Sequence, residues 1–401
     1  MLPRRGECIR LVPSRRARLA ASLLLLTTGA LAASPPSSPE HPSTKVQEAS
    51  GWRLETVAEG LEHPWSIAWL PNGQAVISER PGRLRLLAEG RLQERPISGL
   101  PRILALGQGG LLDLAPHPNF AENRWLYLSY SVGSEDANRV RIGRGRFEDG
   151  QLHDFEVIYQ NPETKSGGQH FGSRLLWLPD GSLLVSLGDG GNPPISFNGE
   201  PIRNQAQALG TVFGKVLRLN ADGSPHPENP FVDEPDARAE IFTFGHRNIQ
   251  GLALNPADAS LWASEHGARG GDEINRLSAG GDYGWPRVTY SREYWGPRIS
   301  ESESSPGVIA PLVVWTPSIA PSGLTFYTGQ EFPDWQGDLF AGALKFRELR
   351  RIDLEDGRPV AEEKFTIGRR VRDVRQGPDA GLYLLTDENP GQLLRLRPTG
   401  D

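Results

Sequence analysis

Short stretches in which apolar and polar residues alternate recur along most of the chain. Each follows a tight turn rich in Pro, Asn, Asp or Gly, as in LPNG with AVISE near residue 70 and LPDG with SLLVSLGD near residue 178. Alternation with a period of two predicts β-strands, because successive side chains of a strand point to opposite faces of a sheet. Six such units occur, with turns that begin at residues 70, 116, 178, 255, 333 and 377.

This repetition predicts an all-β fold, a six-bladed β-propeller, since a repeated strand unit of this size is typical of propeller blades. A β-sandwich with irregular loops is the alternative, but it does not require six copies of one pattern. The intervals from the third to the fourth unit and from the fourth to the fifth are much longer than the first. We therefore expect extra loops on those two blades, and loops often carry function.

The N-terminal segment has the order of a secretory signal instead. Basic residues precede an apolar run that ends in Ala30-Leu31-Ala32, a small-x-small cleavage site. We predict a signal peptide over 1–33, a disordered Pro- and Ser-rich linker over 34–50, and a propeller catalytic domain over 51–401. The apolar run is short for a membrane span, so we expect no stable membrane insertion and a periplasmic or secreted protein. An uncleaved anchor is the alternative. Cleavage would remove Cys8, the single cysteine.

Charge and missing motifs exclude several function classes. The net charge of −6 argues against a nucleic-acid partner, because phosphate binding needs a basic face. The chain has no GxxxxGKS loop, no strand–GxGxxG–helix unit, no GxSxG elbow and no HExxH pair. Nucleotide chemistry, serine hydrolysis and zinc proteolysis are therefore disfavoured.

Clusters of Gly with charged or amide residues lie in turn-like segments, and in a propeller such turns can face the central channel from different blades. Together they would supply an imidazole, several cations and a flexible backbone, which suits an anionic, oxygen-rich cofactor. The clusters are GQGG at 107–110, QHFG at 169–172, GDGG at 188–191, GHRN at 245–248, EHGARGGDE at 265–273, Lys345, and RRVRD at 369–373.

At these residues the chain resembles the soluble dehydrogenases of glucose and other aldose sugars that use pyrroloquinoline quinone (PQQ), over about residues 52–397. The motifs that carry the resemblance are HPWSIAWLPNG, ERPGRL, GQGGLLDLAPHP, GKVLRLN, FGHRNIQGLAL, SEHGARGGDEIN, DYGWP and VRDVRQGPD. It is most similar to the smaller aldose sugar dehydrogenase branch, because the long insertions of the dimeric glucose enzymes are missing. A monomer is therefore expected.

The resemblance implies oxidation of the C1 hydroxyl of an aldose to a lactone, by hydride transfer to calcium-bound PQQ. It makes His170 the general base, Asp189 the carboxylate that orients it, and Arg247 the group that stabilises charge on the quinone oxygen. Electrons would pass on to an external acceptor, a quinone or a small cytochrome. The residues implied to bind PQQ are Gln108, Arg247, Asn248, Lys345, Arg370 and Arg372.

Two calcium sites follow from the same resemblance. The backbone carbonyls of Gly267 and Ala268 would hold the catalytic ion, because calcium readily takes carbonyl oxygens. Glu273 and the backbone of Tyr283 would hold a second, structural ion. Two positions depart from the family: Gln169 replaces an acidic residue of the glucose enzymes, and Ala268 replaces a proline found in many relatives.

Other interpretations of these residues remain open. Taken alone, His170 is more often a hydrogen-bonded structural group, and the arginines near residue 370 could form a solvated strand face. We expect His246 and His266 to be structural donors. At the level of the whole protein, a calcium-dependent propeller lactonase and a non-catalytic binding propeller are the rival functions. Arg and Lys residues in the channel argue against the first, since they would repel a bare cation.

Overall fold

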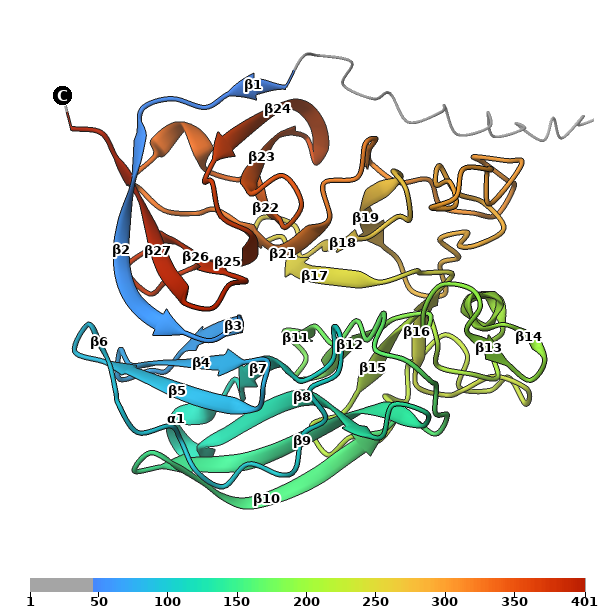
Figure 1. Ribbon diagram of the computed structural model, residues 1–401, viewed down its shortest axis with the longest axis horizontal. Coiled ribbons are helices and arrows are strands. Elements are labelled where there is room, and N and C mark those ends of the chain that lie inside the picture. The colour runs from blue at the N-terminus through green and yellow to red at the C-terminus, as the bar shows by residue number, and fades with distance from the viewer. Residues whose placement is uncertain (1–45, 401) are drawn as a thin grey trace, which may run out of the picture. The chain divides into compact units, whose positions relative to one another are not determined.

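Six blades, each with four antiparallel strands, surround a common axis in the computed structural model, which describes residues 46–400 (Figure 1). A fifth, parallel strand extends the sheet of one blade. The predicted six-bladed β-propeller is confirmed. The predicted signal peptide, the first part of the linker, Cys8 and residue 401 lie outside the described residues.

The first three blades follow one another along the chain. Blade 1 contains β3 (Pro64–Trp69), β4 (Ala75–Glu79), β5 (Arg83–Ala88) and β6 (Arg91–Leu92). Blade 2 contains β7 (Leu111–Pro116), β8 (Trp125–Gly133), β9 (Asn138–Glu148) and β10 (Gln151–Gln160). Blade 3 contains β11 (Leu175–Trp177), β12 (Leu183–Leu187), β15 (Lys215–Leu219) and β16 (Ile241–Phe244).

The remaining blades complete the ring, and the first strand of each blade contacts the first strand of the next. Blade 4 contains β17 (Ile249–Leu254), β18 (Leu261–Glu265), β19 (Asp272–Leu277) and β20 (Val313–Trp315). Blade 5 contains β21 (Pro321–Phe326), β22 (Leu339–Ala343), β23 (Glu348–Glu355) and β24 (Arg358–Thr366). Blade 6 contains β25 (Val371–Gln376), β26 (Leu382–Thr386), β27 (Gly391–Pro398) and β2 (Trp52–Leu61).

The ring is closed by the N-terminal strand. β2 pairs antiparallel with β27, from Trp52 opposite Pro398 to Leu61 opposite Gly391, so blade 6 combines both ends of the described chain. A shorter strand, β1 (Gln47–Glu48), runs parallel to β24 at the edge of blade 5. The end of the predicted linker is therefore part of the fold, because its backbone finds partners at this sheet edge.

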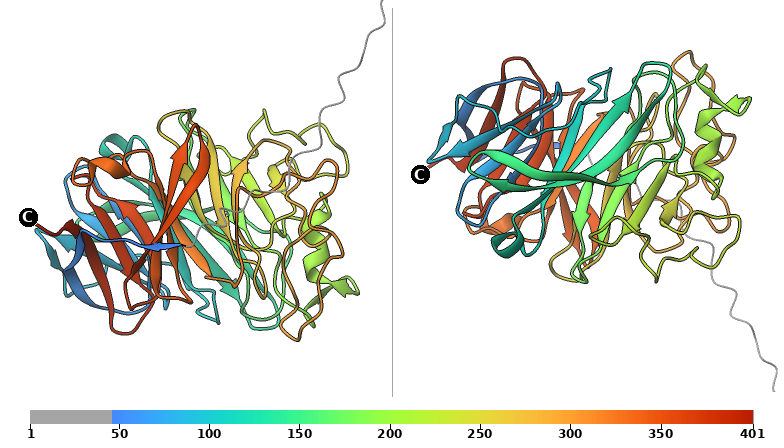
Figure 2. Two further views of the ribbon diagram at one scale, coloured as in Figure 1. Left: turned by 90° about the horizontal axis from the view of Figure 1, so that it is seen from above. Right: turned by 90° about the horizontal axis from the view of Figure 1, so that it is seen from below.

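Alternation along the strands explains why the blades pack side by side. In β12, the side chains of Leu183, Val185 and Leu187 join the core between blades 2 and 3, whereas Leu184 joins the core between blades 3 and 4. Six apolar clusters arise in this way, one between each pair of adjacent blades. The turned views in Figure 2 show the twisted sheets stacked beside one another.

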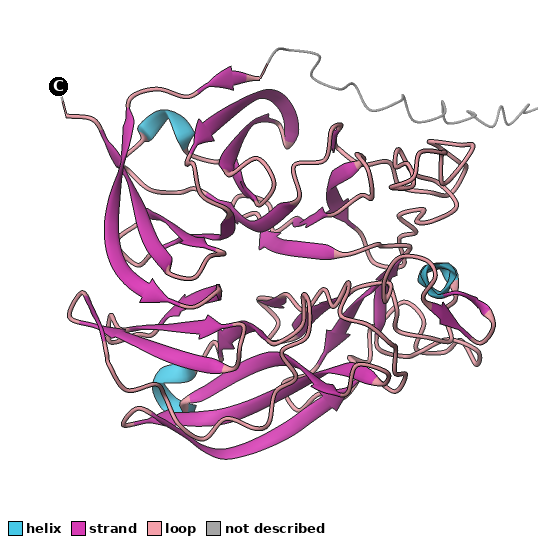
Figure 3. Cartoon of the chain, viewed as in Figure 1, coloured by secondary structure: helices cyan, strands magenta, loops and turns pink. Residues whose placement is uncertain are grey.

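The two longest excursions leave blades 3 and 4, where the uneven spacing of the units predicts them. One, over residues 188–214, contains β13 (Ser196–Phe197), β14 (Glu200–Pro201) and the 3-10 turn η1 (Ile202–Gln207). The other covers residues 278–312 (Figure 3).

Helix is scarce in the part of the chain that the structure describes. It consists of η1, the single turn α1 (Phe120–Asn123) and the 3-10 turn η2 (Pro333–Trp335). Within residues 46–400, no helix is long and apolar enough to cross a membrane.

Candidate functional site

A cavity of about 240 Å³ lies among the first strands of the blades and the turns next to them. Every blade contributes to its wall, so residues far apart in the sequence meet there. Its lining combines apolar side chains with amides, an imidazole and two guanidinium groups. The lining residues are Trp65, Gln108, Leu112, Phe171, Gly172, Gln250, His266, Ala320, Leu344, Arg370 and Arg372. We call it the central cavity.

His170 and Asp189 form a buried pair next to this cavity. Nδ1 of His170 donates to Oδ1 of Asp189 over 2.6 Å, since a carboxylate can only accept. Asp189 is held in turn by the indole of Trp285, which donates to Oδ2 over 2.8 Å, and by the backbone N–H of Gly191. Nε2 of His170 has no hydrogen-bond partner among residues 46–400. The pair thus leaves one ring nitrogen available as an acceptor.

The backbone around His170 is fixed to the cavity wall. His170 has a positive φ of 45°, and its N–H donates to the side-chain oxygen of Gln108. The next two residues, Phe171 and Gly172, line the central cavity, although His170 itself does not. The predicted base is therefore adjacent to the cavity.

Burial is the largest cause that lowers the pKa of His170, and nearby positive charge adds to it. Arg247 and Lys165 both disfavour the imidazolium ion, whereas Asp189 favours it. Because the depressing effects prevail, His170 remains neutral at a pH at which an ordinary histidine would be half protonated.

Arg247 extends beside the pair from the turn that precedes β17. Its guanidinium donates to the carbonyl of His266 over 3.1 Å and to Oδ1 of Asn192 over 2.9 Å. It also lies 5.3 Å from the ring centroid of Trp285, the residue that holds Asp189. Nε of Arg247 is buried without a partner among the described residues. This guanidinium is therefore held in place, and its Nε–H is available to donate a hydrogen bond to a ligand.

Two arginines that line the cavity, Arg370 and Arg372, share one carboxylate. They bond Asp387 at 3.4 and 2.6 Å and lower the pKa of this carboxyl despite its burial. Arg80 is not among the lining residues. Burial lowers its pKa, the charge of Asp387 opposes this, and its guanidinium donates to the carbonyl of Gly107. Arg80 belongs to the ERPGRL motif but is not among the residues predicted to bind the cofactor.

The remaining residues implied to bind the cofactor are placed differently from one another. The side-chain oxygen of Asn248 accepts from Gly172 and Gln250, while its buried Nδ2 has no partner among the described residues. Gln108 and Leu344 line the cavity, but Lys345 is exposed and its ammonium lies 5.4 Å from the ring of Phe346. Lys345 therefore belongs to the rim.

Gly267 and Ala268 form a tight buried turn at the end of β18. The N–H of Gly267 donates to Asp272 over 2.7 Å, and the N–H of Ala268 donates to the hydroxyl of Ser291. A side chain at position 267 would collide with the carbonyl of Gly270, so only glycine fits. Asp272 also accepts from Ser318 and Ala320, which ties this turn to blade 5.

The residues of the second implied calcium site lie around a buried acidic pair. Glu265 and Glu273 are opposite each other on β18 and β19, and the amide of Asn275 donates to both. Burial, followed by the charge of Glu265, holds the pKa of Glu273 well above its usual range. Tyr283 joins this cluster through His246, on which its ring stacks and which donates to Glu265.

The two other histidines of the predicted clusters, His246 and His266, have structural bonds, as expected. His246 accepts from or donates to Thr243 at its other nitrogen, and Nε2 of His266 donates to the carbonyl of Pro321. Burial first, and then Arg247, lower the pKa of His266 to about 3. Nowhere within residues 46–400 do three His, Cys, Asp or Glu side chains converge as metal ligands.

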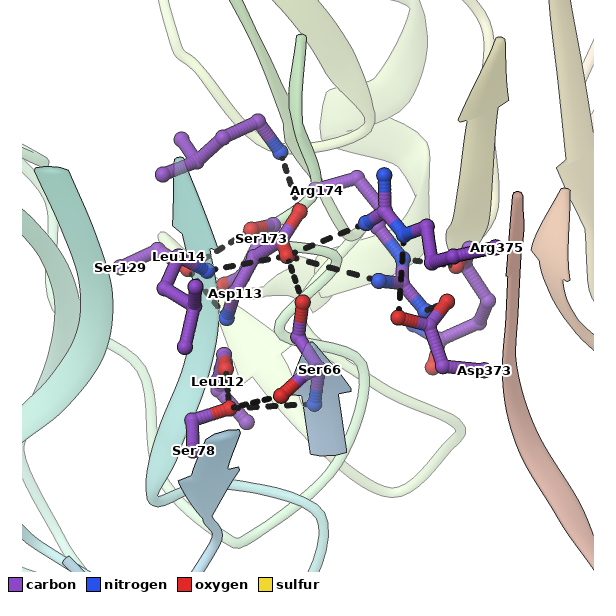
Figure 4. A network of polar contacts seen from close by, with 12 residues as sticks. Ser66, Ser78, Leu112, Asp113, Leu114, Ser129, Ser173, Arg174, Asp373 and Arg375 are labelled. Carbon is purple, nitrogen blue, oxygen red and sulfur yellow. Dashed lines mark hydrogen bonds and ion pairs between the residues drawn. The ribbon is translucent and has the colours of Figure 1, made fainter. Parts of the chain in front are cut away.

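A buried charge network contacts the cavity wall through Arg174, which donates to the carbonyl of Gln250. Figure 4 shows this network. It consists of Asp113 on β7, Arg174 just before β11, and Asp373 and Arg375 on β25. Arg174 bonds Asp373 at 2.9 Å and Asp113 at 3.5 Å, while Arg375 bonds the same two carboxylates at 3.1 and 3.3 Å. The hydroxyl of Ser66 on β3 donates to Asp113. The network therefore joins blades 1, 2, 3 and 6 and is neutral in total.

Comparison with known proteins identifies one family. The glucose/sorbosone dehydrogenase family matches residues 61–395. The aldose sugar dehydrogenase YliI of Escherichia coli is 40% identical over 86% of this chain and 92% of its own length. Quinoprotein glucose dehydrogenase B of Acinetobacter calcoaceticus is 28% identical over 85% and 90%. The solved PQQ-bound form of an aldose sugar dehydrogenase from Streptomyces coelicolor has a TM-score of 0.70 at 26% identity, over 87% of this chain and 99% of its own.

We predict that Arg174→Met destabilises the protein by about 3–5 kcal/mol, because it leaves Asp113 and Asp373 buried with a single cation between them. The measurement is the free energy of unfolding in urea. Arg276→Met is the matched control: Arg276 pairs with Asp258 at 3.1 Å, but both side chains are more than 40% exposed. Its loss should stay below about 1 kcal/mol. Equal losses in the two variants would contradict the structural role of the network.

Proposed function

The chain belongs to the glucose/sorbosone dehydrogenase family, and from this premise we propose that it is a PQQ- and calcium-dependent dehydrogenase. It would oxidise the C1 hydroxyl of aldose sugars to the lactone. The observation that carries the proposal is the buried His170–Asp189 pair next to a cavity whose charged side is made of arginines. Relatives that are a quinoprotein and an aldose sugar dehydrogenase, and a PQQ-bound neighbour, support it.

The donors in the central cavity fit PQQ, which is a flat, aromatic tricarboxylate. Arg370 and Arg372 line the cavity and share the single carboxylate of Asp387, so the cavity has a net positive charge available to anionic groups. Guanidinium groups match carboxylates in a bidentate manner. Trp65, Leu112, Phe171 and Leu344 offer apolar faces, and the unpartnered N–H groups of Arg247, Arg372 and Asn248 offer donors.

Calcium fits the turn at Gly267 and Ala268. Both backbone N–H groups of this turn are directed at side chains, Asp272 and Ser291, which holds the backbone in one conformation. Calcium prefers oxygen ligands, and backbone carbonyls serve it well. Glu273, with Tyr283, is our candidate for a second ion, because a cation would relieve the repulsion between Glu273 and Glu265. When bound, PQQ would supply a hydride acceptor and calcium a Lewis acid.

The roles of the protein's own groups follow from their geometry. Nε2 of neutral His170 would accept the proton of the C1 hydroxyl, while Asp189 keeps the proton of the ring on Nδ1. Trp285 holds the second oxygen of Asp189 and so limits rotation of the pair. Arg247, held by Asn192 and His266, would stabilise negative charge that develops beside it.

Three further features belong to the same proposal. We infer that the protein is exported to the periplasm or secreted, that it acts as a monomer, and that a quinone or small cytochrome accepts its electrons. The sequence of the N-terminal segment and the absence of the long insertions support the first two. The need to reoxidise a two-electron cofactor supports the third.

Reconstitution tests the proposal directly. Apoprotein mixed with PQQ and calcium should reduce an artificial dye when glucose or another aldose is added, and should bind PQQ weakly when calcium is chelated. Both steps are followed by absorbance and by equilibrium titration. A lactonase would hydrolyse a lactone with calcium alone, and a binding module would do neither. Unchanged affinity for PQQ in excess chelator would remove calcium from the proposal.

His170→Ala should lower kcat by roughly 10²–10⁴, the usual contribution of a positioned general base. Loss of a hydride from C1 without removal of the hydroxyl proton would leave an unfavourable cation on the sugar. The fold and the affinity for PQQ should remain. The wild-type rate should fall on the acid side below the usual range of histidine, because the pKa of His170 is lowered, and this limb should vanish in the variant. If the variant reduces bound PQQ with glucose at the wild-type single-turnover rate, His170 is not the general base.

Arg372→Ala should weaken PQQ binding by about 2–5 kcal/mol, since it removes one partner of a desolvated charge pair. Lys345→Ala should have a smaller effect, because Lys345 is exposed on the rim. Arg369→Ala is the matched control: this neighbouring arginine pairs with Glu388 at 2.5 Å and does not line the cavity. Binding is measured by titration with calcium present. Normal PQQ affinity in Arg372→Ala with a raised KM for sugar would show that this end of the cavity holds the substrate.

A further inference from the structure

Lys165 is a buried lysine that borders the same small void as His170. It lies in the loop after β10, is 6% exposed, and is fixed by two backbone hydrogen bonds with Asn138. Its ammonium donates to the carbonyl of Gly167 over 2.9 Å and sits 4.0 Å from the ring centroid of Phe171. Phe171 also lines the central cavity, so one aromatic ring separates Lys165 from it.

The surroundings of Lys165 contain no carboxylate with which it forms an ion pair among residues 46–400. Its side chain packs beside Gly190, where an added β-carbon would lie 3.4 Å from Cδ of Lys165. Lys165 and His170 also border the same small void of about 10 Å³. Asp189 is the acidic group that acts on Lys165, and it is already bonded to His170, Trp285 and Gly191. The charge of Lys165 therefore acts on His170 and Asp189, although Lys165 forms no ion pair with Asp189.

The charged and titratable groups that face His170 come from three sides. Asp189 favours the protonated ring, whereas Arg247, Lys165 and His266, when charged, disfavour it. His266 is not charged in the working range, because its own pKa is about 3. Burial, opposed by Asp189, lowers the pKa of Lys165 to about 7. Lys165 thus gains its charge in the slightly acidic range in which an ordinary histidine would bind a proton.

We propose that Lys165 is a positioning residue that, in its charged form, keeps His170 in its neutral, proton-accepting form by placing a cation close to the His–Asp pair. Asp189 alone would make His170 a better base but would also promote its protonation before the sugar arrives. Lys165, like Arg247, opposes this protonation. The consequence for catalysis rests on the proposed function, whereas the effect on the imidazole does not.

The test is titration of His170 in the apoprotein by NMR with isotopically labelled histidine. The resonance is assigned by its loss in His170→Ala. Lys165→Met removes the charge and keeps the apolar part of the side chain, and Lys165→Gln removes the charge but can still donate to Gly167. In both variants, titration of His170 should move to higher pH, because a like charge that disfavours the imidazolium ion has been lost. In the reconstituted enzyme, the acid limb of kcat/KM should move in the same direction, with KM for sugar unchanged.

Lys215→Met is the matched control. Lys215 is also buried with a pKa lowered to about 7 by burial, but it faces Glu163 and Asp282 and donates to three backbone carbonyls. We expect this variant to lose stability without moving the titration of His170. An unmoved titration in both Lys165 variants, or an equal shift in Lys215→Met, would overturn the proposal. A raised KM for sugar in the Lys165 variants, with no shift in the titration of His170 or in the acid limb of kcat/KM, would overturn it too. Lys165 would then act only by supporting Phe171. If the enzyme oxidises no sugar but the NMR shift is present, the function is wrong and the inference about Lys165 stands.

Discussion

Closure of the ring by β2 and β27 is the constraint on which the other features depend. A propeller blade buries each of its faces against a neighbour, so an open ring would expose two apolar faces and leave two of the six cores incomplete. Leu61 on β2 belongs to the core between blades 6 and 1, far in sequence from Leu393 on β27 in the same cluster. The N-terminal strand therefore completes both a sheet and the circle of cores, and only a complete circle brings six sets of turns to one cavity.

The closed ring contains two kinds of buried charge cluster, one neutral and one with excess positive charge. In the network of Asp113, Arg174, Asp373 and Arg375, two cations face two carboxylates, so the network stabilises the blades without attracting a charged ligand. In the cavity wall, Arg370 and Arg372 share Asp387. Both clusters consist of arginines and aspartates, so they differ only in the ratio of the two. Neutral clusters hold the fold together, and the unbalanced cluster is the one suited to bind an anion.

The sequence predicted the fold well because alternation and turns are local properties. Motifs also located His170 and Asp189, which are 19 residues apart and meet in space. The sequence could not reveal Trp285 as the partner of Asp189, since that contact spans 96 residues and depends on the long loop of blade 4. Lys165 carries no signal in the sequence, because a lone lysine before a glycine-rich turn is normally exposed. The family resemblance implies that Lys345 binds the cofactor, and its side chain is exposed. The linker boundary was misplaced because β1 owes its order to pairing with β24.

The register of blade 6 also determines how the molecule resists force. Trp52 lies opposite Pro398, so the two ends of this hairpin-like pair leave the sheet side by side. Tension applied between an N-terminal tether and a C-terminal attachment would first separate β1 from β24 and then load the hydrogen bonds of β2 and β27 one pair at a time. The same strands would resist pulling along their length far better, because all their hydrogen bonds would then share the load. Force between the two termini therefore acts on the strand pair that closes the ring.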